Sequence, residues 1–148
     1  MSIALSTAIL VLIILLLIMI SAFFSSAETA LTAASEARIR QLAKTKANRQ
    51  AMRVEKLRKN KEELISTILV GNNLVNILAS ALATSAAISL TGDGGVALAT
   101  LVMTVIIVLF AEVLPKSYAF NNADRFSLKI ALIVQIFVWA LKPMTWSL

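Results

Sequence analysis

Three long runs without a charged side chain constrain the fold of this chain more than any other feature. They cover residues 3–24, 64–90 and 94–111, and the apolar character continues past the last of them. A helix needs roughly 20 mostly apolar residues to cross the hydrocarbon core of a bilayer. At 59% hydrophobic residues, the whole chain is also too apolar for a soluble domain of its length. The sequence therefore predicts an all-α integral membrane protein embedded in a lipid bilayer.

The first run is predicted to be a membrane span and not a cleaved signal peptide. It lacks a preceding basic segment, it is too long, and no small-x-small cleavage pattern follows it. We predict three spans, at about residues 3–25, 64–90 and 95–117. The chain is accordingly expected to be a multi-pass protein of the cell (plasma) membrane.

The distribution of charge predicts the orientation of these spans. Ten of the fourteen Lys and Arg residues lie between positions 38 and 61, whereas the connector 91–95 has none. Because cytoplasmic loops are enriched in these residues, the basic segment is expected inside, and the connector and the N-terminus outside. Since the basic cluster lies between two spans, we expect it to meet anionic lipid headgroups, and no nucleic-acid partner is expected.

Two further segments are expected to be helical without crossing the membrane. Apolar residues at helical spacing predict short cytoplasmic helices within residues 35–61, the alternative being a solvated, charge-rich linker. Residues 126–147 could just span if Lys129 and Lys142 snorkelled, but only twelve uncharged residues separate these lysines. The two tryptophans of this segment are typical of interfacial anchors, so an interfacial helix is predicted there.

The second span carries a ridge of small residues, Ala79, Ala83 and Ala87, at a spacing of four. Such ridges allow helices to approach each other closely in lipid. Three spans enclose little interior volume on their own, so we expect a homodimer.

The sequence contains no Cys and no His. Disulfides, thiol chemistry, imidazole bases and the usual zinc or copper sites are therefore excluded. Any bound metal must be held by oxygen, which favours magnesium, calcium, manganese or an alkali ion. Because no helix carries an acid pair either, we do not expect an enzyme.

Clustered polar residues inside two of the spans are candidates for such an oxygen site. Ser21 and Ser25 lie four apart and share a helix face, with Glu28 seven residues from Ser21. Asn72 and Asn76 share a face of the second span in the same way. The alternative is structural: the serines would bond to carbonyls four residues earlier, and the asparagines would only join helices.

Glu112 is a lone carboxylate at the end of the third run, three residues before Pro115. A charged side chain in this position is costly in lipid, so it should face protein, water or an ion. Pro115 has no N–H and is expected to free the carbonyl of residue 111. The alternative is a salt bridge from Glu112 to Lys116, four residues on.

Ser25, Asn72 and Glu112 all fall toward the cytoplasmic ends of their spans, at similar depth. Hydroxyl, amide, carboxylate and freed carbonyl oxygens would together form a site for a hard cation. With so few acids available the affinity should be modest, as transport requires, because a carried ion must also leave.

Three stretches, 21–31, 71–76 and 112–116, resemble the transmembrane domain of the CNNM/CorB/CorC magnesium-transport family. They read SAFFSSAETAL, GNNLVN and EVLPK, and they occur in the family's order. The resemblance implies a homodimer that exports magnesium, driven by sodium entry. It also implies the residues that line the magnesium site: Ser21, Ser25, Asn72, Asn76 and Glu112, with Gly71 lending its carbonyl. Ser26 stands where many relatives have glycine.

In such proteins a paired CBS domain that binds nucleotide follows the membrane domain. It is absent from this sequence, so we expect an isolated core that ATP does not regulate. Because Ser, Asn and Glu oxygens suit both ions, sodium could share the magnesium site or have its own. The alternative function is a membrane anchor or sensor without transport activity.

Overall fold

The computed structural model describes residues 2–45 and 47–145, and every regular element in these two ranges is a helix. The predicted all-α architecture is therefore confirmed. Four segments of the described chain are long and apolar enough to cross a membrane: Ile3–Ala33, Lys61–Thr91, Gly95–Asn121 and Ala123–Thr145. The first three correspond to the three predicted spans, and the fourth is the segment predicted to be interfacial.

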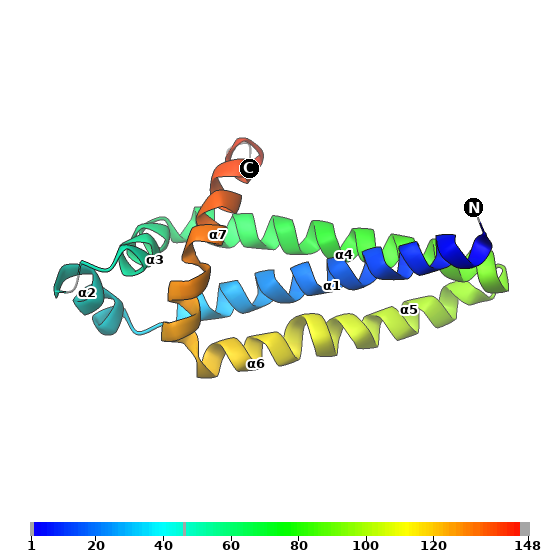
Figure 1. Ribbon diagram of the computed structural model, residues 1–148, viewed down its shortest axis with the longest axis horizontal. Coiled ribbons are helices and arrows are strands. Elements are labelled where there is room, and N and C mark those ends of the chain that lie inside the picture. The colour runs from blue at the N-terminus through cyan, green and yellow to red at the C-terminus, as the bar shows by residue number, and fades with distance from the viewer. Residues whose placement is uncertain (1, 46, 146–148) are drawn as a thin grey trace.

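The first three segments form an antiparallel bundle. Helices α1 (Ile3–Ala33) and α4 (Lys61–Thr91) each have 31 residues and make the most extensive contact between any two helices described. The third rod consists of α5 (Gly95–Ile106), the π-helix η1 (Ile107–Val113) and α6 (Leu114–Asn121). Figure 1 shows the three rods side by side along the long axis of the molecule.

The ends of these helices follow from local sequence. Ser2 caps α1, because its side chain accepts a hydrogen bond from the Leu5 N–H. Helix α4 ends at Gly92, whose φ of +75° lies in the left-handed region that favours glycine. The turn that follows is tight, since a Cβ on Gly95 would lie 2.9 Å from the Ala87 carbonyl oxygen. The two glycines thus allow α5 to turn back directly against α4.

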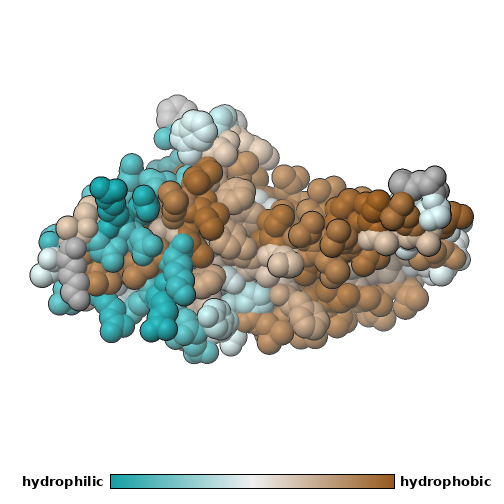
Figure 2. All heavy atoms as spheres, in the orientation of Figure 1, coloured by the Kyte–Doolittle hydropathy of each residue, from teal (hydrophilic) through white to brown (hydrophobic). Residues whose placement is uncertain are grey.

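Apolar side chains cover the outside of the bundle. In α1, no residue from 3 to 17 is buried, although nearly all of them are apolar. Figure 2 shows hydrophobic residues over the shafts of the rods and hydrophilic residues gathered at the end that holds α2 and α3. An apolar surface of this extent is stable only against lipid or another apolar surface. The chain is therefore a multi-pass membrane protein in contact with the bilayer.

The hydrophilic end, called the basic end below, holds the segment predicted as two short helices. These are α2 (Glu36–Thr45) and α3 (Arg49–Lys59), which form a hairpin just before Lys61. Ile39 and Val54 are among the side chains that the hairpin buries in a core shared with α1, α4 and α7. The hairpin is thus packed onto the end of the bundle.

Helix α7 (Ala123–Thr145) differs from the other long helices in direction. Figure 1 shows it crossing α1 and α4 near the basic end rather than running along them. Its buried face packs against α1, α3 and α4. By length and composition it is a fourth candidate span, where the sequence predicts an interfacial helix over 126–147. Residues 146 and 147 of that prediction lie outside the described residues.

A second, smaller core joins the three rods near the middle of their length. Its buried members are Ile18, Ala79, Met103 and Ala111, and Ala83 packs against them. Two of the three ridge alanines therefore lie where the rods meet. The polar residues predicted to bind an ion lie between this small core and the larger core at the basic end.

Candidate functional site

A serine of α1 and an asparagine of α4 join their two helices. The Ser21 hydroxyl donates a hydrogen bond of 2.7 Å to the side-chain carbonyl of Asn72, and Ser21 is fully buried. Ser21 therefore does not bond to the carbonyl four residues earlier, as the structural alternative assumed. Ser26 does so instead, with its hydroxyl 2.7 Å from the Ala22 carbonyl oxygen. The Ser21–Asn72 bond does agree with the other part of that alternative, in which Asn72 joins helices.

Buried oxygen atoms without a hydrogen-bond partner lie close by on the same two helices. Among the described residues four buried side-chain oxygens lack a partner, and three of them belong to Ser25, Thr67 and Asn76. Ser25 lies one turn from Ser21 on α1, and Asn76 lies one turn from Asn72 on α4. A buried polar atom without a partner costs about 1–3 kcal/mol. Because α1 and α4 are antiparallel, Ser25 lies on the basic-end side of the Ser21–Asn72 bond and Asn76 on the other side. These oxygens are therefore candidate ligand positions on both sides of that bond.

Thr67 was not among the predicted site residues. It is fully buried and lies four residues before Gly71, on the buried face of α4. This spacing was the signal in the sequence, because residues four apart share a helix face. A threonine hydroxyl in a long helix usually bonds to the backbone of that helix, so Thr67 was not predicted as a site residue.

Gly71 lies against an aromatic ring. A Cβ on Gly71 would lie 2.8 Å from Cζ of Phe24 in α1, and α4 continues through Gly71 as a regular helix. The same ring contacts Phe137 of α7 edge to face, at a centroid distance of 5.1 Å. Glycine at this position thus makes room for the ring that joins α1, α4 and α7. The role of its carbonyl in ion binding stays a prediction.

Glu112 lies in the π-helix η1 and is half-buried. It forms no ion pair with any described residue. Its alternative partner, Lys116, has its Nζ 3.7 Å from the Glu28 carboxylate of α1 instead. Glu28, which lies on the same predicted helix face as Ser21, is therefore paired with Lys116 of α6. The Glu112 carboxylate remains available for a ligand.

The π-helix leaves a further backbone oxygen without a donor beside Pro115. The Leu114 N–H donates to the carbonyl of Leu109, five residues earlier, and not to that of Phe110. The π-helical donor for Phe110 would be residue 115, which as proline has no N–H. The Phe110 carbonyl thus lacks both of its helical donors. The carbonyl of residue 111 also has Pro115 as its α-helical donor, so its predicted release stays a prediction. Such π-turns inside α-helices are frequent at functional sites.

The π-helix also sets the depth of Glu112 in the bundle. Its neighbour Ala111 is fully buried in the small core with Ile18, which precedes Ser21 by three residues on α1. The π-turn therefore contacts α1 within one turn of the Ser21–Asn72 bond. No hydrogen bond links Glu112 to these two residues.

The arrangement offers oxygen donors only. Hydroxyl, amide and backbone carbonyl oxygens outnumber the single carboxylate, and no three acidic side chains come together in the part of the chain described. This donor set suits a hard cation such as Mg²⁺ or Na⁺. The low charge favours binding that is weak enough to be reversed.

Comparisons with known proteins agree with the motifs. The family model of the cyclin M transmembrane N-terminal domain matches residues 12–148. The chain is 44% identical over 129 residues to the UPF0053 inner membrane protein YfjD of Escherichia coli, which covers 87% of this chain and 30% of that protein. It is 40% identical over 145 residues to a UPF0053 protein of Haemophilus influenzae, which covers 98% of this chain and 34% of that protein.

A chloroplastic DUF21 domain-containing protein of Arabidopsis thaliana is 40% identical over 127 residues, which covers 86% of this chain and 18% of that protein. The chain spans about a third of the length of the two bacterial relatives. The family match covers all three motif stretches, so the resemblance found in the sequence is confirmed. The chain belongs to the CNNM (cyclin M) transmembrane-domain family, together with the UPF0053 and DUF21 proteins of the CorB/CorC type.

Proposed function

We propose that this domain transports magnesium out of the cell, driven by sodium entry. The observation that carries the proposal is the pair of unpartnered buried oxygens, Ser25 Oγ and Asn76 Oδ1, that flank the Ser21–Asn72 hydrogen bond. Membership of the CNNM family is consistent with a role in membrane transport. Catalysis is not part of the proposal, because the site offers ligand oxygens and no paired acid and base.

The proposed ligands of the ion are the six predicted residues: Ser21, Ser25, Gly71, Asn72, Asn76 and Glu112. Magnesium gives up its water shell reluctantly and needs a near-octahedral set of oxygens in exchange. Neutral oxygens of α1 and α4 would supply most of this set, and Glu112 would supply the charge. The Ser21–Asn72 bond uses the hydroxyl proton and one lone pair of the amide oxygen, so both oxygens keep lone pairs for an ion. With a single carboxylate among the ligands the affinity stays modest, which favours release.

The orientation, membrane and assembly belong to the same proposal. The basic end is proposed to face the cytoplasm, because Lys and Arg are enriched in cytoplasmic loops. The cell membrane is proposed as the location, since the Escherichia coli relative is described as an inner membrane protein. A homodimer, and a nucleotide-binding CBS pair in a longer protein, are proposed from the family resemblance. The unburied apolar face of α1 offers surface for a second copy.

Magnesium flux into proteoliposomes tests the proposal. The wild-type chain is compared with Glu112→Gln, which removes the charge of the site and keeps its shape. The matched control is Glu28→Gln, the same chemical change on a carboxylate that faces Lys116. We expect the wild type and Glu28→Gln to carry magnesium into the liposomes while sodium leaves them down its own gradient. We expect no magnesium flux from Glu112→Gln.

The other outcomes each correct a different part of the proposal. Wild-type protein without flux would favour the membrane anchor or sensor. Equal flux from Glu112→Gln would move the ion site away from η1. Flux that does not respond to the sodium gradient would keep magnesium transport and remove the coupling.

A further inference from the structure

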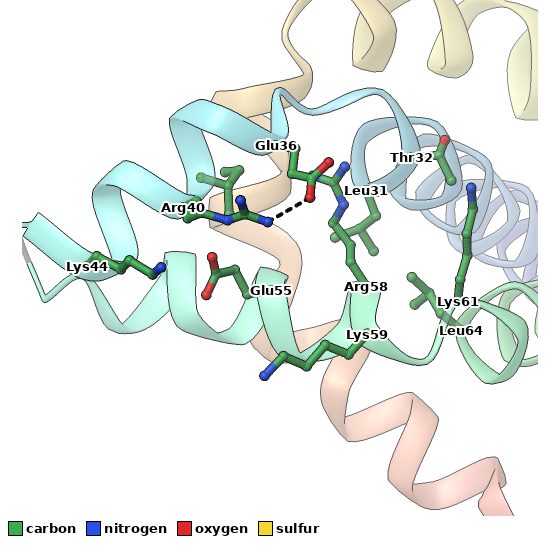
Figure 3. A pocket seen from close by; sticks show the side chains of 11 residues that line it. Leu31, Thr32, Glu36, Arg40, Lys44, Glu55, Arg58, Lys59, Lys61 and Leu64 are labelled. Carbon is green, nitrogen blue, oxygen red and sulfur yellow. Dashed lines mark hydrogen bonds and ion pairs between the residues drawn. The ribbon is translucent and has the colours of Figure 1, made fainter.

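A cavity of about 550 Å³ lies at the basic end, away from the polar residues of the proposed ion site. Residues of α1, α2, α3 and α4 line it, and Figure 3 shows their side chains converging from these four helices. Five of the lining residues are basic and two are acidic: Arg40, Lys44, Arg58, Lys59 and Lys61 against Glu36 and Glu55. This space is called the basic cavity below.

The protein neutralises only part of the positive charge around the basic cavity. Arg40 Nη2 lies 2.9 Å from Glu36 Oε1, and Arg58 Nη1 donates to the Ala34 carbonyl over 3.0 Å. The three lysines form no ion pair with any described residue. Basic side chains that surround a hollow in this way attract an anion.

The basic cavity is backed by apolar side chains that expose almost no surface. These are Leu31, Ile39 and Leu64, and all three are buried in the core of the basic end. Leu64 is the first residue of the uncharged run in α4, and Lys61 lies one turn before it. The cavity therefore lies where the apolar shafts meet the charged end. Figure 2 shows the change from hydrophobic to hydrophilic residues along the molecule. Lipid phosphates lie just beyond the hydrocarbon core, at this kind of boundary.

We propose that the basic cavity binds the phosphate headgroup of an anionic phospholipid from the adjacent leaflet. The lysines would meet the phosphate, and the acyl chains would run along the exposed apolar surface of the shafts. The cavity lies at the end of the uncharged run of α4, the depth at which lipid phosphates lie, and this position favours a lipid over a soluble phosphate. Basic pockets of this kind recognise lipid headgroups elsewhere. The bound lipid would tie the hairpin of α2 and α3 to the ends of α1 and α4.

Photo-crosslinking in nanodiscs tests this inference with the full chain. The probe is a photoreactive phosphatidylglycerol, present as a minor component in phosphatidylcholine, and the modified peptides are mapped by mass spectrometry. Crosslinks are expected at the ends of α1 and α4 that line the cavity. Unlabelled phosphatidylglycerol should compete, whereas glycerol 3-phosphate at the same concentration should not.

A charge-matched pair of variants separates the cavity from general attraction to the basic end. Lys44→Gln/Lys61→Gln removes two lysines that lie on opposite sides of the cavity in Figure 3. We expect roughly tenfold weaker labelling, since each basic residue near a membrane surface contributes to binding an anionic lipid. The control, Arg125→Gln/Lys129→Gln, makes the same charge change at two exposed residues outside the cavity and should label as the wild type does.

Three results would overturn the inference. Wild-type protein without crosslinks at the cavity would show that no lipid binds there. Equal loss of labelling in both double variants would show attraction by the basic end as a whole. Competition by glycerol 3-phosphate would assign the cavity to a soluble phosphate compound. None of these depends on magnesium transport, so the lipid site and the proposed function fail separately.

Discussion

Replacing Ser25 by alanine should stabilise the magnesium-free protein. Ser25 Oγ is buried and has no hydrogen-bond partner, and a buried polar atom in this state costs about 1–3 kcal/mol. Alanine removes the oxygen and leaves a void no larger than a methyl group, which costs about 1 kcal/mol at most. The gain from removing the unpartnered oxygen thus exceeds or equals the cost of the void. The free energy of unfolding should therefore rise by about 1 kcal/mol.

Ser21→Ala is the matched control, and its effect should have the opposite sign. Both serines are fully buried in α1, so the void left by the hydroxyl is the same. Ser21 donates over 2.7 Å to Asn72, and its loss leaves the amide oxygen without a donor. Hydrogen bonds between membrane helices contribute about 0.6 kcal/mol on average, with a maximum near 1.7. Ser21→Ala should therefore lower the free energy of unfolding by about 1 kcal/mol.

Reversible unfolding in mixed micelles, followed by circular dichroism, measures both changes. Under the proposed function, magnesium at ten times its dissociation constant adds about 1.4 kcal/mol to the wild type and much less to either variant. A Ser25→Ala protein that is less stable without magnesium would refute the reasoning, because the hydroxyl would then have a partner. An undiminished magnesium effect in that variant would remove Ser25 from the ion site.

Three further substitutions test the structure at single positions. Gly71→Ala should lower the free energy of unfolding by about 1–3 kcal/mol, because its Cβ would lie 2.8 Å from the buried ring of Phe24. Thermal unfolding measures this change. Adding Phe24→Leu should recover part of the loss. Pro115→Ala supplies an N–H for the Phe110 carbonyl and should reduce magnesium flux in proteoliposomes; unchanged flux would contradict a role for that oxygen. Gly92→Ala should cost about 1–3 kcal/mol in thermal unfolding, because its φ of +75° and ψ of −163° lie in a region nearly restricted to glycine, and it should leave flux unchanged.

The bundle could be predicted from the sequence because uncharged runs and helical spacing are local signals. Residues 3–24 and 64–90 need no knowledge of their neighbours to be identified as membrane helices. The course of α7 could not be predicted in this way. It depends on how Ala131 and the rest of its buried face pack against α1, α3 and α4, which are distant in the sequence.

The candidate site shows the same division. The shared face of Ser21 and Ser25 follows from the helical period, but their partners do not. Glu28 fits the same stripe and yet pairs with Lys116, because α6 happens to pass beside it. The π-turn around Glu112 is likewise invisible in the sequence, since a register of five rather than four residues is set by packing and not by residue type.

The uneven burial along the rods gives the molecule a gradient of stiffness. Five helices share one core at the basic end. In α1, by contrast, none of residues 3–17 is buried. In the described parts of the other two rods, Gly95 is the only buried residue beyond the small core. Regions with few buried contacts open at lower free energy. Amide hydrogens in the half of the rods away from the basic end should therefore exchange first in detergent. At the basic end α7 packs across α1 and α4, so amide hydrogens there should exchange later. The polar residues around Ser21 lie where the loosely packed half of the rods meets the well-packed half.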